Sequence, residues 1–107
     1  MQKNFEQRVL EIVKRIPSGK VTTYGEIARV CGVKSSARMV GWVLSRNANV
    51  ELPFHRVVNR SGSLTGKYHF ETPSLMKELL IDEGITFNED NVELAKFLWH
   101  PESENYI

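Results

Sequence analysis

The stretch TYGEIARVCGVKSSARMVGWVLSR, residues 23–46, decides the fold, because it has the pattern of two short helices separated by a tight turn. Thr23 followed three residues later by Glu26 is the spacing of a capping box, in which each residue caps the other's backbone. This spacing predicts that a helix begins at Tyr24 and continues to Val30.

The turn and the second helix follow directly. Gly32 is suited to end the first helix in a left-handed cap, and Ser35 or Ser36 is suited to cap a second helix over residues 37–46. Two short helices joined by a glycine-containing turn, with small residues and an outward arginine on the second, are typical of the helix-turn-helix. We therefore predict a mainly α, winged helix-turn-helix-like DNA-binding domain with short extended segments.

The second helix has two faces of different character. Arg38 and Trp42 are four residues apart, so they project together on one face. The apolar residues at helical spacing on the other face are expected to pack inward; they are Ala37, Val40, Val43 and Leu44.

A longer amphipathic helix precedes this unit, because apolar residues between Phe5 and Ile16 recur at helical spacing until Pro17. After the second short helix, residues 47–52 lose the helical period, and Pro53 disfavours helix at the residue before it. We expect an irregular loop at this point of the chain.

The last third of the chain is predicted to contain one clear helix. Residues 59–63 have turn chemistry. Thr72 as N-cap and Pro73 at the first helical position predict the start of the helix, and Gly84 predicts its end. The apolar residues after Gly84 fit either a short strand or a short helix packed on the body, and residues 101–107 have the pattern of a tail.

Composition limits the class of protein. The 107 residues, 41% hydrophobic and 25% charged, are enough for one small globular domain. No apolar run approaches the roughly 20 residues that span a bilayer, and the polar first residues lack a signal peptide's apolar stretch. We expect a cytoplasmic monomer without contact to a membrane. Cys31 is the single cysteine, so no internal disulfide forms.

The net charge of +1 conceals a strong polarity along the chain. Residues 1–67 hold 12 of the 14 lysines and arginines but four acids, which is a charge of +8. Residues 68–107 carry −7. A polyanion such as DNA fits the first segment, although charges also segregate on ordinary solvated surfaces.

Four segments now give a resemblance: VTTYGEIA (21–28), ARMVG (37–41), PFHRV (53–57) and LLIDEG (79–84). In this order they resemble the C-terminal DNA-binding domain of the O6-alkylguanine-DNA alkyltransferases, and within that family the alkyltransferase-like proteins. Each segment alone is weak, whereas four in series are specific. We expect one domain over residues 1–107, with the motifs in a core from about 5 to 85 and a C-terminal extension over residues 86–107.

The resemblance implies roles for two residues that face DNA. Tyr24 is expected to help rotate the phosphate and to donate a hydrogen bond to an extruded guanine, unless it only anchors the start of its helix. Arg38 is expected to enter the gap left by the flipped base, where a planar cation offsets part of the cost of flipping. The alternative for Arg38 is a plain phosphate contact.

The resemblance also implies that the second short helix docks in the minor groove. Ser36, Ala37 and Gly41 are small enough for that approach. Because the minor groove carries a degenerate pattern, damage rather than sequence is then the specificity determinant. Asn47 corresponds to the family's hinge between this helix and the site loop, although asparagine is also a common helix C-cap.

Phe54 stands where the alkyltransferases have their nucleophilic cysteine. A phenyl ring has no lone pair to attack an alkyl carbon, so we expect the chain to have no catalytic residues. His55 and Glu83 remain from the family's triad and are expected to form a buried hydrogen-bonded pair. Alkyltransferase-like proteins usually carry tryptophan at this position, and phenylalanine is smaller and lacks the indole donor.

Further pocket residues come from the resemblance alone. Arg56 is expected to support the loop through carbonyls or a carboxylate, and the Val57 carbonyl to accept from the guanine amino group. Lys67 lies in the loop that would close over the base, unless it is simply a solvated lysine. Residues 68–70 form an aromatic cluster, of which we select Tyr68 as a pocket residue.

The resulting hypothesis is a non-enzymatic protein that flips O6-alkylguanine out of double-stranded DNA and marks it for nucleotide excision repair proteins. One alternative is a winged-helix regulator that binds undamaged DNA. Another is a residual enzyme, either a transferase that uses Cys31 or a hydrolase that uses His55 and Glu83. Cys31 follows an apolar helical stripe, which favours a buried, inert thiol. No Cys/His cluster has metal-ligand spacing, and no cofactor is expected.

Overall fold

The computed structural model describes residues 3–32 and 35–102. Its helices, short 3₁₀ helices (η) and strands are, in chain order, α1 Phe5–Arg15, β1 Thr22–Thr23, α2 Tyr24–Cys31, α3 Ala37–Arg46, η1 Phe54–Arg56, β2 Val57–Val58, η2 Lys67–His69, α4 Leu75–Asp82, β3 Phe87–Asn88, β4 Asn91–Val92 and α5 Leu94–Phe97.

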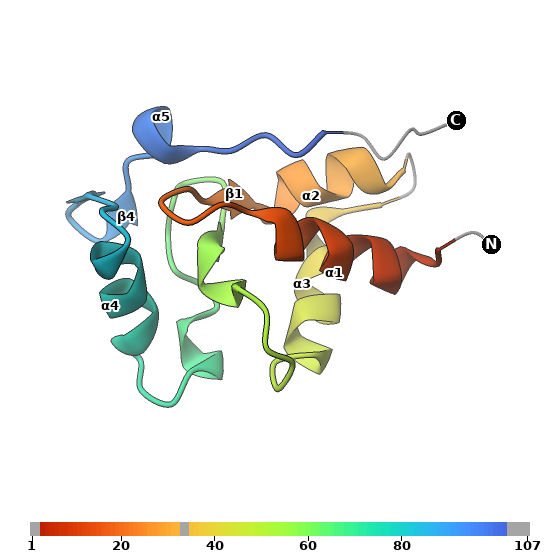
Figure 1. Cartoon of the computed structure of the whole chain (residues 1–107), viewed down its shortest axis with the longest axis horizontal. Coiled ribbons are helices and arrows are strands. Elements are labelled where there is room, and N and C mark those ends of the chain that lie inside the picture. The colour runs from red at the N-terminus through yellow and green to blue at the C-terminus, as the bar shows by residue number, and fades with distance from the viewer. Residues whose placement is uncertain (1–2, 33–34, 103–107) are drawn as a thin grey trace.

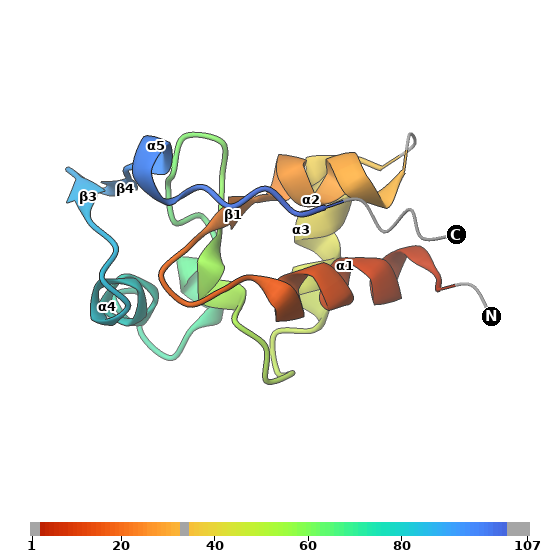
Figure 2. The same ribbon diagram turned by 45° about the horizontal axis from the view of Figure 1, so that its top comes forward.

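The helices gather at two ends of an elongated molecule. Helices α1, α2 and α3 form one end, while α4 and the hairpin of β3 and β4 form the other (Figure 1). The parallel strands β1 and β2 lie between them and pair Thr22 with Val57 and Thr23 with Val58. Figure 2 shows the segment after α5 returning along β1 toward α2. This mainly helical architecture with short strands confirms the predicted fold class.

Helix α1 begins with a complete capping box, whereas the sequence analysis predicted one only at the start of α2. The Asn4 Oδ1 atom accepts from the Gln7 amide at 2.8 Å, and the Gln7 Oε1 atom accepts from the Asn4 amide at 3.0 Å. The apolar face of the helix packs inward, as predicted, with Val9, Ile12 and Val13 buried and Phe5 and Leu10 partly buried, and Ile16 is its C-cap.

Helix α2 begins at the predicted residue but with half of the predicted cap. The Thr23 hydroxyl accepts from the Glu26 amide at 3.1 Å. The Glu26 carboxylate instead binds Arg29 and His100, so the prediction that Glu26 caps the Thr23 backbone in return is wrong. Gly32 has φ 134° and ψ 166°, which is outside the left-handed helical region, so the predicted left-handed cap is also wrong.

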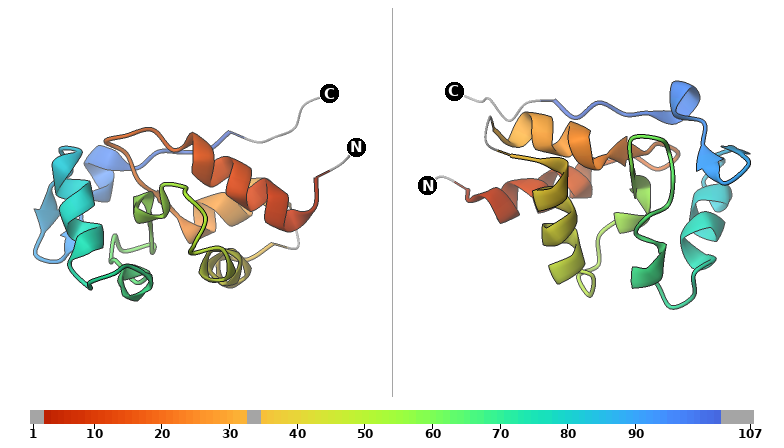
Figure 3. Two further views of the ribbon diagram at one scale, coloured as in Figure 1. Left: turned by 60° about the horizontal axis from the view of Figure 1, so that its bottom comes forward. Right: turned by 180° about the vertical axis from the view of Figure 1, so that it is seen from behind.

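Helix α3 leaves α2 at a steep angle and completes the helix-turn-helix (Figure 3). Its N-cap is Ser36, whose hydroxyl accepts from the Met39 amide at 3.2 Å. Val40 and Leu44 are buried as predicted, but Ala37 is exposed. Its single methyl group does not reach the side chains that cover the larger residues, which corrects the prediction that it packs inward.

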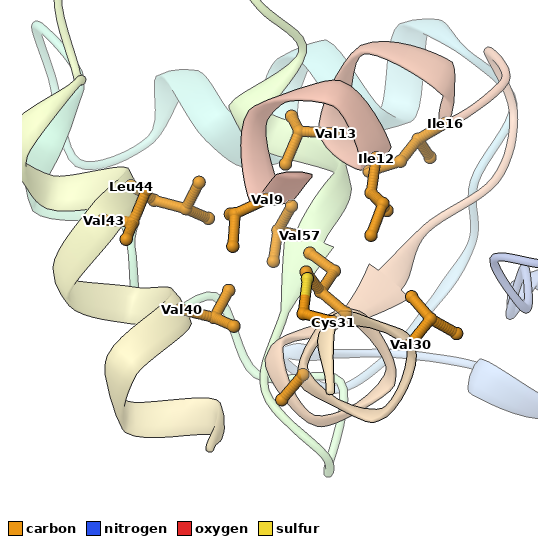
Figure 4. Packing of buried hydrophobic residues seen from close by; sticks show 12 residues of the cluster. Val9, Ile12, Val13, Ile16, Val30, Cys31, Val40, Val43, Leu44 and Val57 are labelled. Atoms are coloured by element: carbon orange, nitrogen blue, oxygen red, sulfur yellow. The ribbon is translucent and has the colours of Figure 1, made fainter. Parts of the chain in front are cut away.

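Two hydrophobic clusters stabilise the two ends. Figure 4 shows side chains from α1, α2, α3 and β2 converging on one interior, with Val57 in the middle. A second cluster lies around Met76 and Leu80 of α4 and takes in Leu94 and Phe97 at its edge. Both predicted alternatives for the region after Gly84 therefore occur, a short hairpin followed by a short helix.

Helix α4 begins later than predicted. The sequence pattern placed its start at Thr72 and Pro73, whereas Ser74 is the N-cap and Leu75 the first residue. The Thr72 carbonyl accepts from the Leu75 amide at 3.2 Å, so the predicted cap residues form a separate turn before the helix. Gly84 follows its C-terminal end, as expected, at φ 90°. Within residues 3–32 and 35–102, every helix falls short of the length and apolarity that a bilayer crossing needs.

Candidate functional site

The loop after α3 brings Phe54 back against the helix-turn-helix. The Phe54 amide donates to the Leu52 carbonyl at 2.8 Å, and the Arg56 amide donates to the Pro53 carbonyl at 3.0 Å, which forms the single turn of η1. The next residues enter β2, whose pairing with β1 places this turn beside the start of α2. Phe54 is half-buried and packs against the first cluster.

A cavity of about 90 Å³ lies next to the Phe54 ring. Since about 10–15 Å³ is enough for one water molecule on the same measure, the cavity is several times larger than a packing defect. Its walls come from α2, α3, η1 and the region around η2. The lining residues are Tyr24, Gly41, Leu44, Ser45, Ala48, Phe54, Gly66, His69 and Phe70.

Two glycines make room around Tyr24. A Cβ atom on Gly41 would lie 3.8 Å from the Tyr24 ring, and one on Gly66 would lie 3.3 Å from the Tyr24 hydroxyl. The phenol therefore stands between α3 and the loop near η2, with no side chain from either glycine against it. Sequence reasoning selected Tyr24, Gly41 and Phe54, and the structure brings these residues together.

Sequence reasoning missed part of the cavity wall. Leu44 and Ser45 follow Gly41 at intervals of three and four, so helical spacing alone would have indicated them, whereas Ala48 lies in the turn after α3. His69 and Phe70 belong to the recognised aromatic cluster, but no local pattern shows which of its members face inward.

Lys67 and Tyr68 lie elsewhere. The Tyr68 side chain is 74% exposed, and the Lys67 Nζ atom stands 5.3 Å from the centre of its ring. Both line a separate hollow beside Pro73 and Lys77. In this structure His69 and Phe70, rather than Lys67 and Tyr68, line the cavity beside Phe54.

Glu83 forms the centre of a polar network behind η1. Its carboxylate accepts from His55 Nε2 at 2.8 Å, from Arg56 at 2.7 to 3.1 Å, and from the Gly19 amide at 3.1 Å. Burial by itself raises the pKa of Glu83, but the hydrogen bonds from Arg56, His55 and Gly19 outweigh it and lower the pKa to about 2. The predicted pairing of His55 with Glu83 is confirmed.

In this structure Arg56 and Val57 belong to the framework of the loop and do not line the cavity. The Arg56 guanidinium binds Glu83 and donates to the Ile16 carbonyl at 2.8 Å, which confirms its predicted support through a carboxylate and a carbonyl. Val57 is 1% exposed in β2, and neither residue lines the cavity.

The predicted DNA-facing residues cluster at the start of α3. Ser36, Ala37 and Arg38 are exposed, and within residues 3–32 and 35–102 the Arg38 side chain has no hydrogen bond or ion pair. Its guanidinium is therefore available to a ligand. Gly41 follows one turn later, at the edge of the cavity.

Asn47 ends α3 and ties it to α1. Its side-chain amide donates to the Val43 carbonyl at 2.8 Å and to Glu6 Oε2 at 2.7 Å. Its carbonyl accepts from the Val50 amide at 2.9 Å, so Asn47 also joins the helix to the loop that leads to Phe54.

Cys31 is 4% exposed within the first hydrophobic cluster and does not line the cavity. In the part of the chain that the structure describes, no group of three or more His, Cys, Asp or Glu side chains is placed to hold a metal ion.

A helix-turn-helix whose second helix borders a cavity, with a Pro-Phe-His-Arg turn and a partly buried glutamate behind it, defines a class of DNA-binding domain. The family model for the DNA-binding domain of 6-O-methylguanine DNA methyltransferase matches residues 4–85. The chain belongs to this family.

Two curated relatives are similar over nearly the whole chain. The DNA base-flipping protein of Escherichia coli is 42% identical over 103 residues, which cover 91% of this chain and 75% of the relative. Alkyltransferase-like protein 1 of Schizosaccharomyces pombe is 34% identical, with 91% and 95% covered. The crystal structure of S. pombe Atl1 with damaged DNA containing O6-carboxymethylguanine matches with a TM-score of 0.73 at 33% identity, over 94% of this chain and 100% of that chain.

Proposed function

We propose that this protein binds O6-alkylguanine in double-stranded DNA by flipping the damaged nucleotide into the cavity beside Phe54, and that it holds the base without removing the alkyl group. The cavity is the observation that carries the proposal. It opens next to the recognition helix, and aromatic rings of Tyr24, Phe54 and Phe70 contribute to its lining. Relatives named for base flipping and a relative solved with damaged DNA support it.

The lining fits a planar, alkylated base. Aromatic side chains offer flat faces for stacking, and the Tyr24 hydroxyl supplies a hydrogen-bond donor for a guanine edge. Extruding a nucleotide costs a few kcal/mol of stacking and pairing. Arg38, exposed and one turn before Gly41, is the group that enters the vacated stack and offsets part of this cost.

Alkyl transfer has no thiol nucleophile in this cavity. Its lining residues include no cysteine, and the phenyl ring of Phe54 offers no electron pair to an alkyl carbon. Glu83 and His55 are held in place by Arg56 and Gly19, which is a structural role that requires no reaction. A protein that holds a lesion without repairing it is suited to mark the site for excision repair proteins.

A titration of two matched duplexes tests the proposal. One duplex carries a single O6-methylguanine, the other carries guanine at that position, and fluorescence anisotropy of the labelled DNA reports binding. We expect a clear gain in affinity for the lesion duplex. Equal affinities would overturn the proposal and favour a regulator that binds undamaged DNA.

A pair of neighbouring substitutions tests the cavity itself. Ala48 and the adjacent Asn49 are both exposed, but only Ala48 lines the cavity. Ala48→Phe is expected to fill the space and to remove the lesion preference, while Asn49→Phe retains it. A lesion preference that survives in Ala48→Phe would show that the base is bound elsewhere.

Mass spectrometry after incubation with the lesion duplex tests the absence of transfer. We expect an unchanged protein mass and an intact O6-methylguanine in the DNA. An alkyl adduct on the protein would identify a transferase, and restored guanine without an adduct would identify a hydrolase.

A further inference from the structure

Trp42 is the one large apolar side chain of α3 that is mostly exposed, at 63%. It is nevertheless held in position. The Arg46 guanidinium lies 4.6 Å from the centre of the indole ring, a cation–π contact, and its Nη2 atom lies 3.7 Å from Glu6 Oε1 on α1. An exposed indole that is supported in this way is oriented before any ligand arrives.

The position of Trp42 around the helix relates it to the cavity. Gly41, Leu44 and Ser45 line the cavity from one side of α3. Successive helical residues are about 100° apart, so Arg38 lies roughly 60° beyond Gly41, and Trp42 lies roughly 40° beyond Arg38 in the same direction. Around the helix axis, Arg38 therefore lies between Gly41 and Trp42.

We propose that Trp42 packs against the sugar–phosphate backbone of the DNA strand opposite the flipped nucleotide. This inference rests on the proposed function, in which the lesion strand supplies the base in the cavity and Arg38 enters the gap in the stack. The side of α3 beyond Arg38 then faces the complementary strand, and Trp42 is the most exposed of the large apolar side chains on that side.

The chemistry of this surface favours a nucleic acid backbone. An indole has an apolar face that fits a deoxyribose ring and a single N–H that donates to a phosphate oxygen. Arg38 and Arg46 flank Trp42 with positive charge, and the Glu6 carboxylate that approaches Arg46 also accepts a hydrogen bond from Asn47. A polyanion complements this charge, and the surface is continuous with the cavity rim.

Intrinsic fluorescence reports the contact directly, because the chain has two tryptophans. Trp99 is half-buried against the first cluster, so Trp99→Phe leaves Trp42 as the sole indole. We expect the lesion duplex to quench and shift the Trp42 emission, at the concentrations at which the labelled DNA shows binding. Unchanged emission while binding occurs would overturn the inference and would leave a protein partner as the reason for this exposed indole.

Uncharged methylphosphonate linkages identify the strand. Neutral linkages in the complementary strand opposite the lesion are expected to weaken wild-type binding by about tenfold, the size of one good contact. Trp42→Ala is expected to lose about tenfold on the unmodified duplex and then to be insensitive to those linkages. Ile81→Ala, another exposed apolar residue but on α4, is the control and should behave as wild type.

Equal sensitivity of wild type and Trp42→Ala to the neutral linkages would overturn the strand assignment. A failure of the proposed function gives a different result, because wild type itself would then show no preference for the lesion duplex. Trp42→Ala should retain the ratio of lesion to normal affinity, since it leaves the cavity intact.

Discussion

Glu83 is a single carboxylate that joins three parts of the chain, the turn after α1, the η1 turn and the end of α4. Its side chain is 14% exposed, as is that of His55, so the network is largely shielded from water. A carboxylate that accepts from a guanidinium, an imidazole and a backbone amide strongly favours its charged form. The position of Phe54, directly before His55, therefore depends on the ionisation of Glu83.

This network predicts a loss of stability in acid. The pKa of Glu83 falls from 4.5 to about 2 on folding, which corresponds to about 3 kcal/mol. Because the folded pKa is lowered, this stabilisation is complete above pH 4.5 and is lost as the pH falls toward 2. Urea unfolding of wild type and Glu83→Gln across this range measures it. The variant should be less stable at neutral pH and less sensitive to acid; parallel curves would contradict the prediction.

Arg38 is tested by separating its charge from its planar shape. Arg38→Ala is expected to lower affinity for the lesion duplex by about 1–3 kcal/mol, because it removes the group that stacks in the vacated site. Arg38→Lys keeps the charge without the plane and should recover only part of this loss. Anisotropy titration measures both, with Arg60→Ala as an exposed arginine control. Full recovery by lysine would reduce Arg38 to a phosphate contact.

The loop between β2 and η2 is hydrogen-bonded to the β3–β4 hairpin at Gly62. The Asn59 side chain accepts from the amides of Ser61 and Ser63, which closes the turn that the sequence predicts. Gly62 then stands at φ 85°, and its carbonyl accepts from the Val92 amide at 2.9 Å. A Cβ atom at Gly62 would collide with the Val92 carbonyl.

Two glycine substitutions separate collision from backbone strain. Gly62 and Gly84 both have positive φ, but a Cβ atom at Gly84 would meet nothing within 4 Å. Gly84→Ala is expected to cost about 1–2 kcal/mol through its backbone alone. Gly62→Ala should cost at least about 2 kcal/mol more, because the hairpin must move. Denaturant unfolding measures both; equal costs would show that the hairpin yields without penalty.

The basic and acidic parts of the sequence lie at opposite ends of the molecule. Residues 71–93, which form the end with α4, β3 and β4, hold seven acids and a single lysine, while α1 to α3 form the basic end (Figure 1). The Cα atoms extend over 41 × 28 × 21 Å, so the two ends are well separated. The basic end carries the recognition helix and the cavity rim, which orients the molecule toward a polyanion.

This arrangement predicts different salt responses for affinity and for lesion preference. Each phosphate contact contributes a slope of about −0.9 to the logarithm of affinity against the logarithm of salt. Affinity for both duplexes should therefore fall steeply with salt. The ratio of the two affinities should stay nearly constant, because stacking in the cavity involves no counterion release. Titrations at several salt concentrations test this, and a lesion preference that disappears with salt would contradict it.

The sequence by itself determined the elements whose hydrogen bonds and contacts are local. Ser36 and Thr23 mark helix starts because a cap bonds an amide three residues away, and apolar spacing identifies the buried face of α1. The resemblance of four segments identified the family and the pairing of His55 with Glu83, 28 residues apart.

Only the tertiary structure decided which side chains enclose the cavity. Its walls come from four separate segments, and whether His69 and Phe70 rather than Tyr68 face inward depends on how η2 is oriented against α3. The same holds for Glu26, which leaves its capping box to bind His100, 74 residues away. Contacts between distant segments depend on how the whole chain packs, because no short stretch of sequence contains both partners.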